Sequence, residues 1–163
     1  MKTLLIVYHS MTGGAAQMAA ACERGGATEA GVVVRRLAAA GANAADVLAA
    51  DGYVFVTPEN LASMSGMMKD FFDRTYYPVL DRANGRPYAA MICAGSDGQG
   101  AARQIERICK GWRFKRVAET LIVSTYAQTP TEILAPKTIS SGELARCEGV
   151  GAALAAGLAL GVF

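Results

Sequence analysis

Metal-binding residues are scarce in this chain, which has one histidine and four cysteines among 163 residues. Cys22, Cys93, Cys109 and Cys147 lie far apart and form no C-x-x-C pair. Because zinc sites usually combine closely spaced cysteine and histidine ligands, we expect no metal site. We expect instead that the cysteines are buried, unpaired thiols.

A strong net charge is also missing. Sixteen Lys and Arg residues against fourteen Asp and Glu residues leave a net charge of only +2. Such a small excess creates no field that would attract nucleic acid or an anionic membrane, so we predict no polyanionic partner. The chain is 52% hydrophobic and 18% charged, which is typical of globular proteins, and its length predicts one domain over residues 1–163.

No apolar run is long enough to cross a membrane. The most apolar stretch, residues 149–163, falls short of the roughly 20 residues that a spanning helix needs. Glycines recur in this stretch, and each weakens a helix by about 1 kcal/mol relative to alanine. The N-terminal run Leu4–Tyr8 is too short for a secretory signal and is typical of a buried strand. We expect no membrane span and a cytoplasmic protein.

Short apolar runs alternate with segments of helical periodicity. The predicted strands are Leu4–Tyr8, Val32–Val34, Tyr53–Val56, Tyr88–Ala94 and Val117–Tyr126. The predicted helices are residues 15–28, 42–50, 65–77, 101–112 and 141–160. Short runs without alternation indicate strands that are covered on both faces, as in parallel sheets. We predict an α/β fold with a doubly wound, five-stranded parallel sheet of order 2-1-3-4-5 and helices on both faces.

The third predicted helix carries a single apolar stripe. Its members are Met64, Met67, Met68, Phe71 and Phe72. Such spacing is typical of residues that pack on a core. The alternative is that part of the stripe contacts a partner subunit.

The ligand site of such a sheet lies outside the carboxyl ends of its strands, where the winding direction reverses. For this strand order, that point lies between the first and third strands. The loops after Tyr8 and Val56 should therefore form the site, with the loop after Ala94 as a third wall.

The first of these loops has the composition of an anion cradle. Its candidate binding residues are Ser10, Met11, Thr12, Gly13, Gly14 and Ala15. Hydroxyl groups, glycines and free N–H groups at a helix start together favour binding of a phosphate. The alternative is that Thr12 only caps the helix and that the glycines only form a tight turn.

Two nucleotide-binding classes and the receiver domains are excluded by what this loop lacks. No lysine follows Gly13 or Gly14, as the P-loop motif requires, and the G-x-G-x-x-G dinucleotide motif is absent. A receiver domain needs paired acidic residues after the first strand, where this chain has His9 and Ser10.

The segment Tyr8–Gly13 resembles the phosphate loop of flavodoxins and of NAD(P)H-dependent FMN or quinone reductases. The second loop strengthens the resemblance with Pro58, Glu59, Asn60, Leu61, Ala62 and Ser63, followed by Gly66, Lys69 and Asp73. The third loop, with Gly95, Ser96, Asp97 and Gly98, is similar to the glycine-rich loop that borders the flavin ring. The resemblance implies a flavodoxin-like fold and FMN held by the backbone of these three loops.

This resemblance also implies an enzyme that takes electrons from NAD(P)H and passes them through FMN to a quinone, flavin or similar small acceptor. It implies a homodimer or a higher homo-oligomer. Because the chain lacks the acidic surface of electron-shuttle flavodoxins, we favour the reductase over the shuttle. The flavin carries the hydride chemistry, so we assign no catalytic side chain. The alternatives are an electron carrier and a binding module without tightly bound flavin.

Two departures from the family pattern bear on FMN affinity. Ala15 removes a hydroxyl donor from the phosphate loop, and Asn60 stands where reductases often have an aromatic residue. Ring stacking would then come from elsewhere, for instance from Tyr126 or a second subunit.

His9 and a group of basic residues each allow two interpretations. His9 is either a solvated loop side chain or a direct participant in catalysis. The basic residues Lys110, Arg113, Lys115 and Arg116 surround Trp112. They either complement a helix end or contact the extra phosphate of NADPH.

Overall fold

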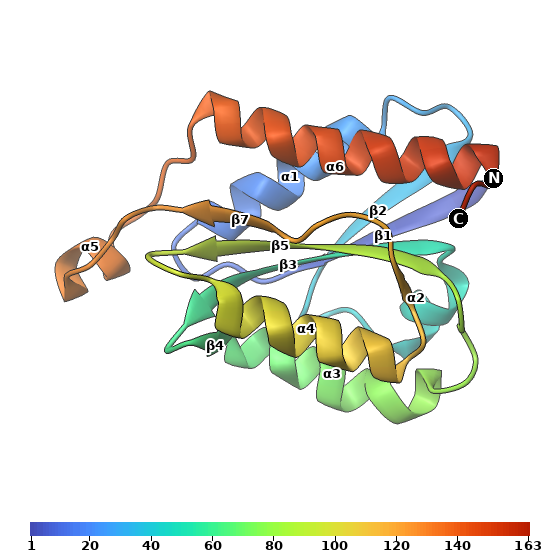
Figure 1. Ribbon diagram of the computed structural model, residues 1–163, viewed down its shortest axis with the longest axis horizontal. Coiled ribbons are helices and arrows are strands. Elements are labelled where there is room, and N and C mark those ends of the chain that lie inside the picture. Colours follow the sequence, from blue (N-terminus) through green and yellow to red (C-terminus); the bar gives the residue numbers. More distant parts are fainter.

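A parallel sheet lies between two layers of helices in the computed structural model, which describes residues 1–163 (Figure 1). The main strands are β1 (Lys2–Tyr8), β2 (Val32–Ala38), β3 (Gly52–Asn60), β5 (Pro87–Ala94) and β7 (Leu121–Ser124). Helices α1 (Gly14–Gly26) and α6 (Ser141–Leu160) cover one face. Helices α2 (Ala44–Ala49), α3 (Gly66–Val79) and α4 (Gln99–Gly111) cover the other. The predicted α/β fold with helices on both faces is confirmed.

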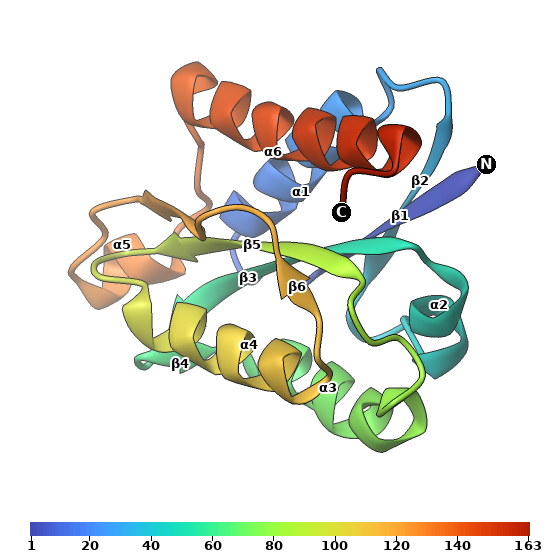
Figure 2. The ribbon, with the colours of Figure 1, turned by 45° about the vertical axis from the view of Figure 1, so that its right-hand side comes forward.

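The order of the sheet is β2-β1-β3-β5, and the last position is filled by two short strands in place of the single predicted one. These are β6 (Lys115–Arg116; Figure 2) and β7 (Figure 1), which both pair with β5 in parallel. Between these pairings, the four residues 117–120 stand opposite only two residues of β5. The two extra residues have no partners on β5, so the chain leaves the sheet between β6 and β7. The predicted strand Val117–Tyr126 is therefore not one continuous strand.

Two further elements were not predicted from the sequence. β4 (Ser63–Met64) pairs antiparallel with the end of β3, and α5 (Pro130–Leu134) follows β7. Both lie at the carboxyl end of the sheet (Figure 1).

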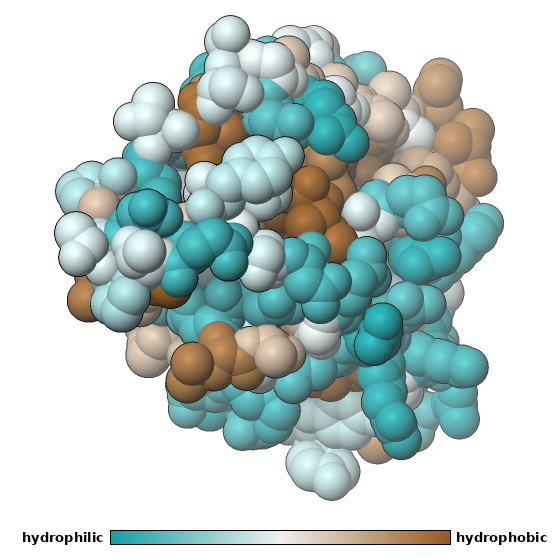
Figure 3. Space-filling model, turned by 60° about the vertical axis from the view of Figure 1, so that its left-hand side comes forward, coloured by the Kyte–Doolittle hydropathy of each residue, from teal (hydrophilic) through white to brown (hydrophobic).

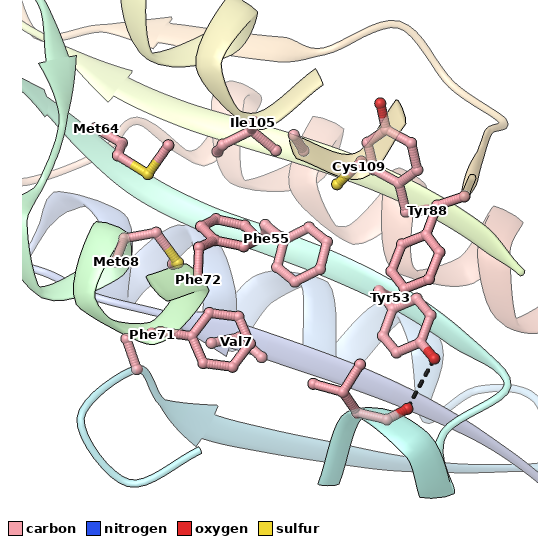
Figure 4. Packing of buried hydrophobic residues seen from close by; sticks show 14 of the residues in the cluster. Val7, Tyr53, Phe55, Met64, Met68, Phe71, Phe72, Tyr88, Ile105 and Cys109 are labelled. Carbon is pink, nitrogen blue, oxygen red and sulfur yellow. Dashed lines mark hydrogen bonds between the residues drawn. The ribbon is translucent and has the colours of Figure 1, made fainter. Parts of the chain in front are cut away.

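The core between the sheet and helices α3 and α4 is rich in aromatic residues. Phe55 on β3 packs against Phe72 on α3 at 5.1 Å between ring centroids (Figure 4). Phe72 also packs against Trp112, at 5.6 Å. Within the predicted stripe, Met67 is 40% exposed. The other four members, Met64, Met68, Phe71 and Phe72, are buried in this core. The core interpretation of the stripe is therefore confirmed for those four residues.

The opposite core depends on close contact between α1 and α6, which lie side by side (Figure 2). A Cβ atom built on Gly151 of α6 would lie 1.9 Å from the carbonyl oxygen of Cys22 on α1. Gly151, one of the glycines expected to weaken this helix, therefore allows α1 and α6 to approach closely. α6 continues without interruption to Leu160. No helix, α6 included, combines the length and the apolar character needed to cross a membrane.

All four cysteines are buried and unpaired, as predicted. Burial raises the pKa of Cys22 to about 12 and that of Cys147 to about 11. These thiols are therefore protonated at neutral pH and are poor nucleophiles.

Candidate functional site

A cleft opens at the carboxyl ends of β1, β3 and β5, the end that Figure 3 turns toward the viewer. Its wider part has a volume of about 420 Å³, within the range of small-molecule sites. Nine predicted site residues line the cleft: Met11, Thr12, Pro58, Glu59, Asn60, Leu61, Ala62, Gly95 and Ser96. The others, Ser10, Gly13, Gly14, Ala15, Ser63, Asp97 and Gly98, lie in the same loops but do not line it.

The first loop turns sharply into α1. Gly13 has a φ of 99°, a conformation that favours glycine, and it caps the helix without any side-chain hydrogen bond. Its N–H donates to the Ser10 hydroxyl oxygen at 3.1 Å, so Ser10 braces the loop from within. Thr12 is not the helix cap, which makes the alternative explanation of this residue wrong.

Unused hydrogen-bond donors are concentrated in this loop. The N–H groups of Met11, Thr12, Gly14 and Ala15 have no acceptor within the chain. They precede or begin α1, where the helix dipole places partial positive charge. The donor set therefore fits a phosphate group.

Gly14 packs closely against a buried side chain beneath the first loop. A Cβ atom at this position would lie 2.6 Å from the Sγ atom of Cys93, at the end of β5. Burial raises the pKa of the Cys93 thiol to about 11 although the charge of Lys137 opposes the shift, so the thiol is neutral at pH 7. Cys93 therefore supplies packing here, and a larger residue at Gly14 would displace it.

The second loop forms a tight hairpin between β3 and β4. Leu61 and Ala62 make the turn with φ values of 51° and 62°, and Leu61 is fully exposed. The side chain of Ser63 donates to Gln104 Oε1 at 3.1 Å and so points toward α4. The helix cap of α3 is Ser65, whose hydroxyl oxygen accepts from the N–H of Met68.

Glu59 joins the second loop to the third. Its carboxylate accepts from the N–H groups of Gly98 and Ala101, each at 3.0 Å, and so caps the start of α4. The Gly98 N–H, which was expected among the donors to a flavin ring, is bound by Glu59 in this structure. The N–H groups of Gly95, Ser96 and Asp97 have no acceptor in the chain and remain available.

Close backbone contacts fix the positions of the second and third loops. A Cβ atom on Gly95 would lie 2.5 Å from the carbonyl oxygen of Ala127. One on Gly100 would lie 2.0 Å from the carbonyl oxygen of Ala62. Both glycines are therefore required by the approach of a second segment of backbone.

A fourth wall of the cleft was not predicted from the sequence. It comes from residues 125–137, with Thr125, Ala127, Gln128, Ile133 and Lys137 lining the cleft. Thr129, Pro130 and Glu132 form a recognisable helix start, with Pro130 at the first turn and Thr129 as the cap of α5. That pattern could have revealed α5 but not its position beside the first loop.

No aromatic side chain lines the cleft. Tyr126 has a φ of 60° and is 79% exposed, and it borders a neighbouring hollow instead. A ring bound in the cleft would meet aliphatic side chains such as Met11 and Ile133. Tyr126 therefore does not line the cleft in this structure, although its neighbours Thr125 and Ala127 do.

His9 is half-buried and does not line the cleft. Burial lowers its pKa, so the ring is neutral at pH 7, and its Nδ1 atom has no hydrogen-bond partner. His9 is therefore partly withdrawn from solvent, and it lies outside the residues that line the cleft.

The basic residues around Trp112 lie at the far end of α4. Arg113 pairs with Asp81 at 2.6 Å, and Arg116 pairs with Glu106 at 3.3 Å. Because α4 has 13 residues, these basic residues lie about 20 Å from the third loop, which precedes the helix. The geometry favours the helix-end interpretation over contact with NADPH in the cleft.

Comparison with known proteins places the chain among flavoproteins. The family model of NADPH-dependent FMN reductases matches residues 34–128, more than half of the chain. A flavodoxin from Aquifex aeolicus is 31% identical over 100 residues, which are 61% of this chain and 54% of that protein. The match thus spans about half the length of this relative.

Solved structures share the fold over nearly the whole chain. A flavodoxin from the domain Archaea superposes with a TM-score of 0.76 and 18% identity, covering 94% of this chain and 96% of that one. A flavodoxin, WrbA-like protein from Agrobacterium tumefaciens gives 0.72 and 16% identity, covering 99% of both chains. These similarities establish the flavodoxin-like architecture.

Proposed function

Since the chain belongs to the NADPH-dependent FMN reductase family, we propose that it is an oxidoreductase that binds FMN in the cleft and reduces it with NAD(P)H. Electrons then pass to a small acceptor such as a quinone or a flavin. The observation that carries this proposal is the group of unused N–H donors between Met11 and Ala15, at the start of α1.

The parts of the cleft match the parts of the cofactor. The first loop offers donors to the phosphate, and Gly95, Ser96 and Asp97 offer N–H groups to the polar edge of the ring. Such donors stabilise negative charge on a reduced flavin. Bound FMN supplies hydride and electron transfer, and the chain supplies binding, orientation and shielding from water.

An electron carrier remains the second candidate, favoured by the similarity to the Aquifex flavodoxin. Docking on a redox partner usually relies on complementary charge, whereas this chain has a net charge of +2. The small net charge supports a small-molecule acceptor. The buried, unpaired cysteines support a reducing compartment such as the cytoplasm.

We also propose that the site is completed in a homodimer or a higher homo-oligomer. Met11 and Leu61 line the cleft and are 50% and 100% exposed, although both are large apolar residues. Because no aromatic residue of the same chain lines the cleft, a second subunit could supply one. Sedimentation analysis of the FMN-loaded protein should give a mass above that of one chain, and a monomer would contradict this proposal.

Mixing purified protein with FMN should give a stable complex with a visible flavin spectrum, and adding NADPH or NADH should bleach it. Oxidation of NAD(P)H should then become catalytic when a quinone is supplied. A colourless protein that fails to bind added FMN would refute the proposal. A stable FMN complex that NADPH and NADH do not bleach would favour the electron carrier, which takes its electrons from a redox partner.

The double variant Ser10→Ala with Thr12→Val should weaken FMN binding by about tenfold or more, because it removes the brace of the loop and a cleft hydroxyl. Titration of flavin fluorescence measures the change. Thr120→Val, between β6 and β7, is the control and should leave affinity unchanged. Unchanged affinity in the double variant would place the phosphate elsewhere.

A further inference from the structure

Lys137 is held against the first loop although it lies more than one hundred residues away in the sequence. Its N–H donates to the carbonyl oxygen of Thr12 at 2.9 Å. The Gln17 side chain donates to the carbonyl oxygens of Gly13 at 3.0 Å and Lys137 at 2.7 Å, and it accepts from the N–H of Ile139 at 3.0 Å. The backbone of Lys137 is therefore clamped to the loop from two directions.

The side chain of Lys137 points to the same place. Its ammonium group donates to the Thr12 hydroxyl at 3.4 Å, to the carbonyl oxygen of Ile133 at 2.9 Å and to that of Ala135. All three acceptors are uncharged, and no carboxylate lies within ion-pairing distance. This half-buried cation therefore makes no ion pair within the chain.

Lys137 is also the only basic residue that lines the cleft, and Glu59 is the only acidic one. The carboxylate of Glu59 is already bound by the N–H groups of Gly98 and Ala101 at the start of α4. The cleft thus contains one unpaired positive charge, beside the loop with unused N–H donors.

We propose that Lys137 is the counter-charge for the phosphate of the bound flavin and makes the cleft selective for FMN over riboflavin, an inference that rests on the proposed function. Ala15 leaves the loop without one hydroxyl donor, and the backbone N–H groups contribute only partial charges. A phosphate monoester carries a charge of about −1.5 to −2 at pH 7. An ammonium group beside it compensates for the missing hydroxyl through a charge-assisted hydrogen bond.

The test compares Lys137→Met with wild-type protein by titrating FMN and riboflavin separately. The variant should bind FMN about ten- to hundredfold more weakly, because a hydrogen bond between charged groups is lost. Riboflavin, which has no phosphate, should bind both proteins equally. The decline of FMN affinity with added salt should also become shallower in the variant.

Two companion variants separate charge from loop shape. Lys110→Met removes the same charge from an exposed position near the end of α4 and should leave FMN affinity unchanged. Lys137→Arg keeps the charge and should retain most of the affinity. Riboflavin binding by Lys137→Met, at the wild-type level, shows that the cleft is still formed.

The possible outcomes distinguish this inference from the proposed function. Equal weakening of FMN and riboflavin would mean that Lys137 only shapes α5, and unchanged FMN affinity would mean that it does not face the phosphate. Either result overturns the inference while FMN binding by the wild-type protein stands. Failure of the wild-type protein to bind FMN overturns the proposed function itself.

Discussion

Replacing Gly151 by valine should destabilise the protein by more than about 3 kcal/mol, a large part of the stability of a typical domain. A Cβ atom at this position would lie 1.9 Å from the Cys22 carbonyl oxygen and 2.9 Å from the Gly26 nitrogen. Because both are backbone atoms of α1, no side-chain rotation can relieve the overlap, and α6 must move off the sheet. Urea unfolding followed by circular dichroism measures the loss.

Gly149, on the same helix, provides the matched control. A Cβ atom there would have no neighbour within 4 Å, so Gly149→Ala should raise stability by about 0.5–1 kcal/mol through helix propensity alone. Equal effects of the two substitutions would contradict the close packing of α1 and α6 described above.

Glu59→Ala should lower the free energy of unfolding by about 2–4 kcal/mol and should also weaken FMN binding. The carboxylate accepts from the N–H groups of Gly98 and Ala101, and Gly98 has no side chain with which to cap α4 itself. Without Glu59, these donors are left unpaired and the hairpin after β3 loses its tie to the third loop. Thermal unfolding and FMN titration measure the two effects.

Two further variants test this explanation. Glu59→Gln keeps one acceptor oxygen without the charge, so it should show an intermediate loss. Glu119→Ala removes a carboxylate that is 93% exposed and 3.8 Å from Arg116, and it should change stability by less than about 0.5 kcal/mol. If Glu59→Ala were as mild as Glu119→Ala, the capping role would be refuted.

The sheet and the location of the cleft were predictable because both follow from local patterns. Runs such as Leu4–Tyr8 and Tyr88–Ala94 carry no alternation, as expected for strands covered on both faces, and they became β1 and β5. The order of a parallel sheet then determines which loops meet. The loops after Tyr8, Val56 and Ala94 therefore came together as expected.

The features that were not predictable depend on contacts between distant segments. Residues 117–120 leave the sheet because of their register with β5, which the apolar run itself does not encode. From the sequence, Gly151 is expected only to weaken its helix. The structure shows that it also allows the close approach of α1. Lys137 reaches Thr12 across 125 residues of sequence, and no motif links the two positions.

The turn at Leu61 and Ala62 also bears on how fast a ligand can enter. Two adjacent residues with side chains adopt left-handed conformations, each costing about 1–2 kcal/mol, and only two residue pairs hold β3 and β4 together. The hairpin is also tied to α4, because the Ser63 hydroxyl and the Met64 N–H donate to Gln104 Oε1 at 3.1 and 2.8 Å. Opening it breaks these bonds but leaves the pairing of β3 with β1 and β5 intact. Loop motions take nanoseconds to microseconds, so entry of a ligand is not limited by rearrangement of the sheet.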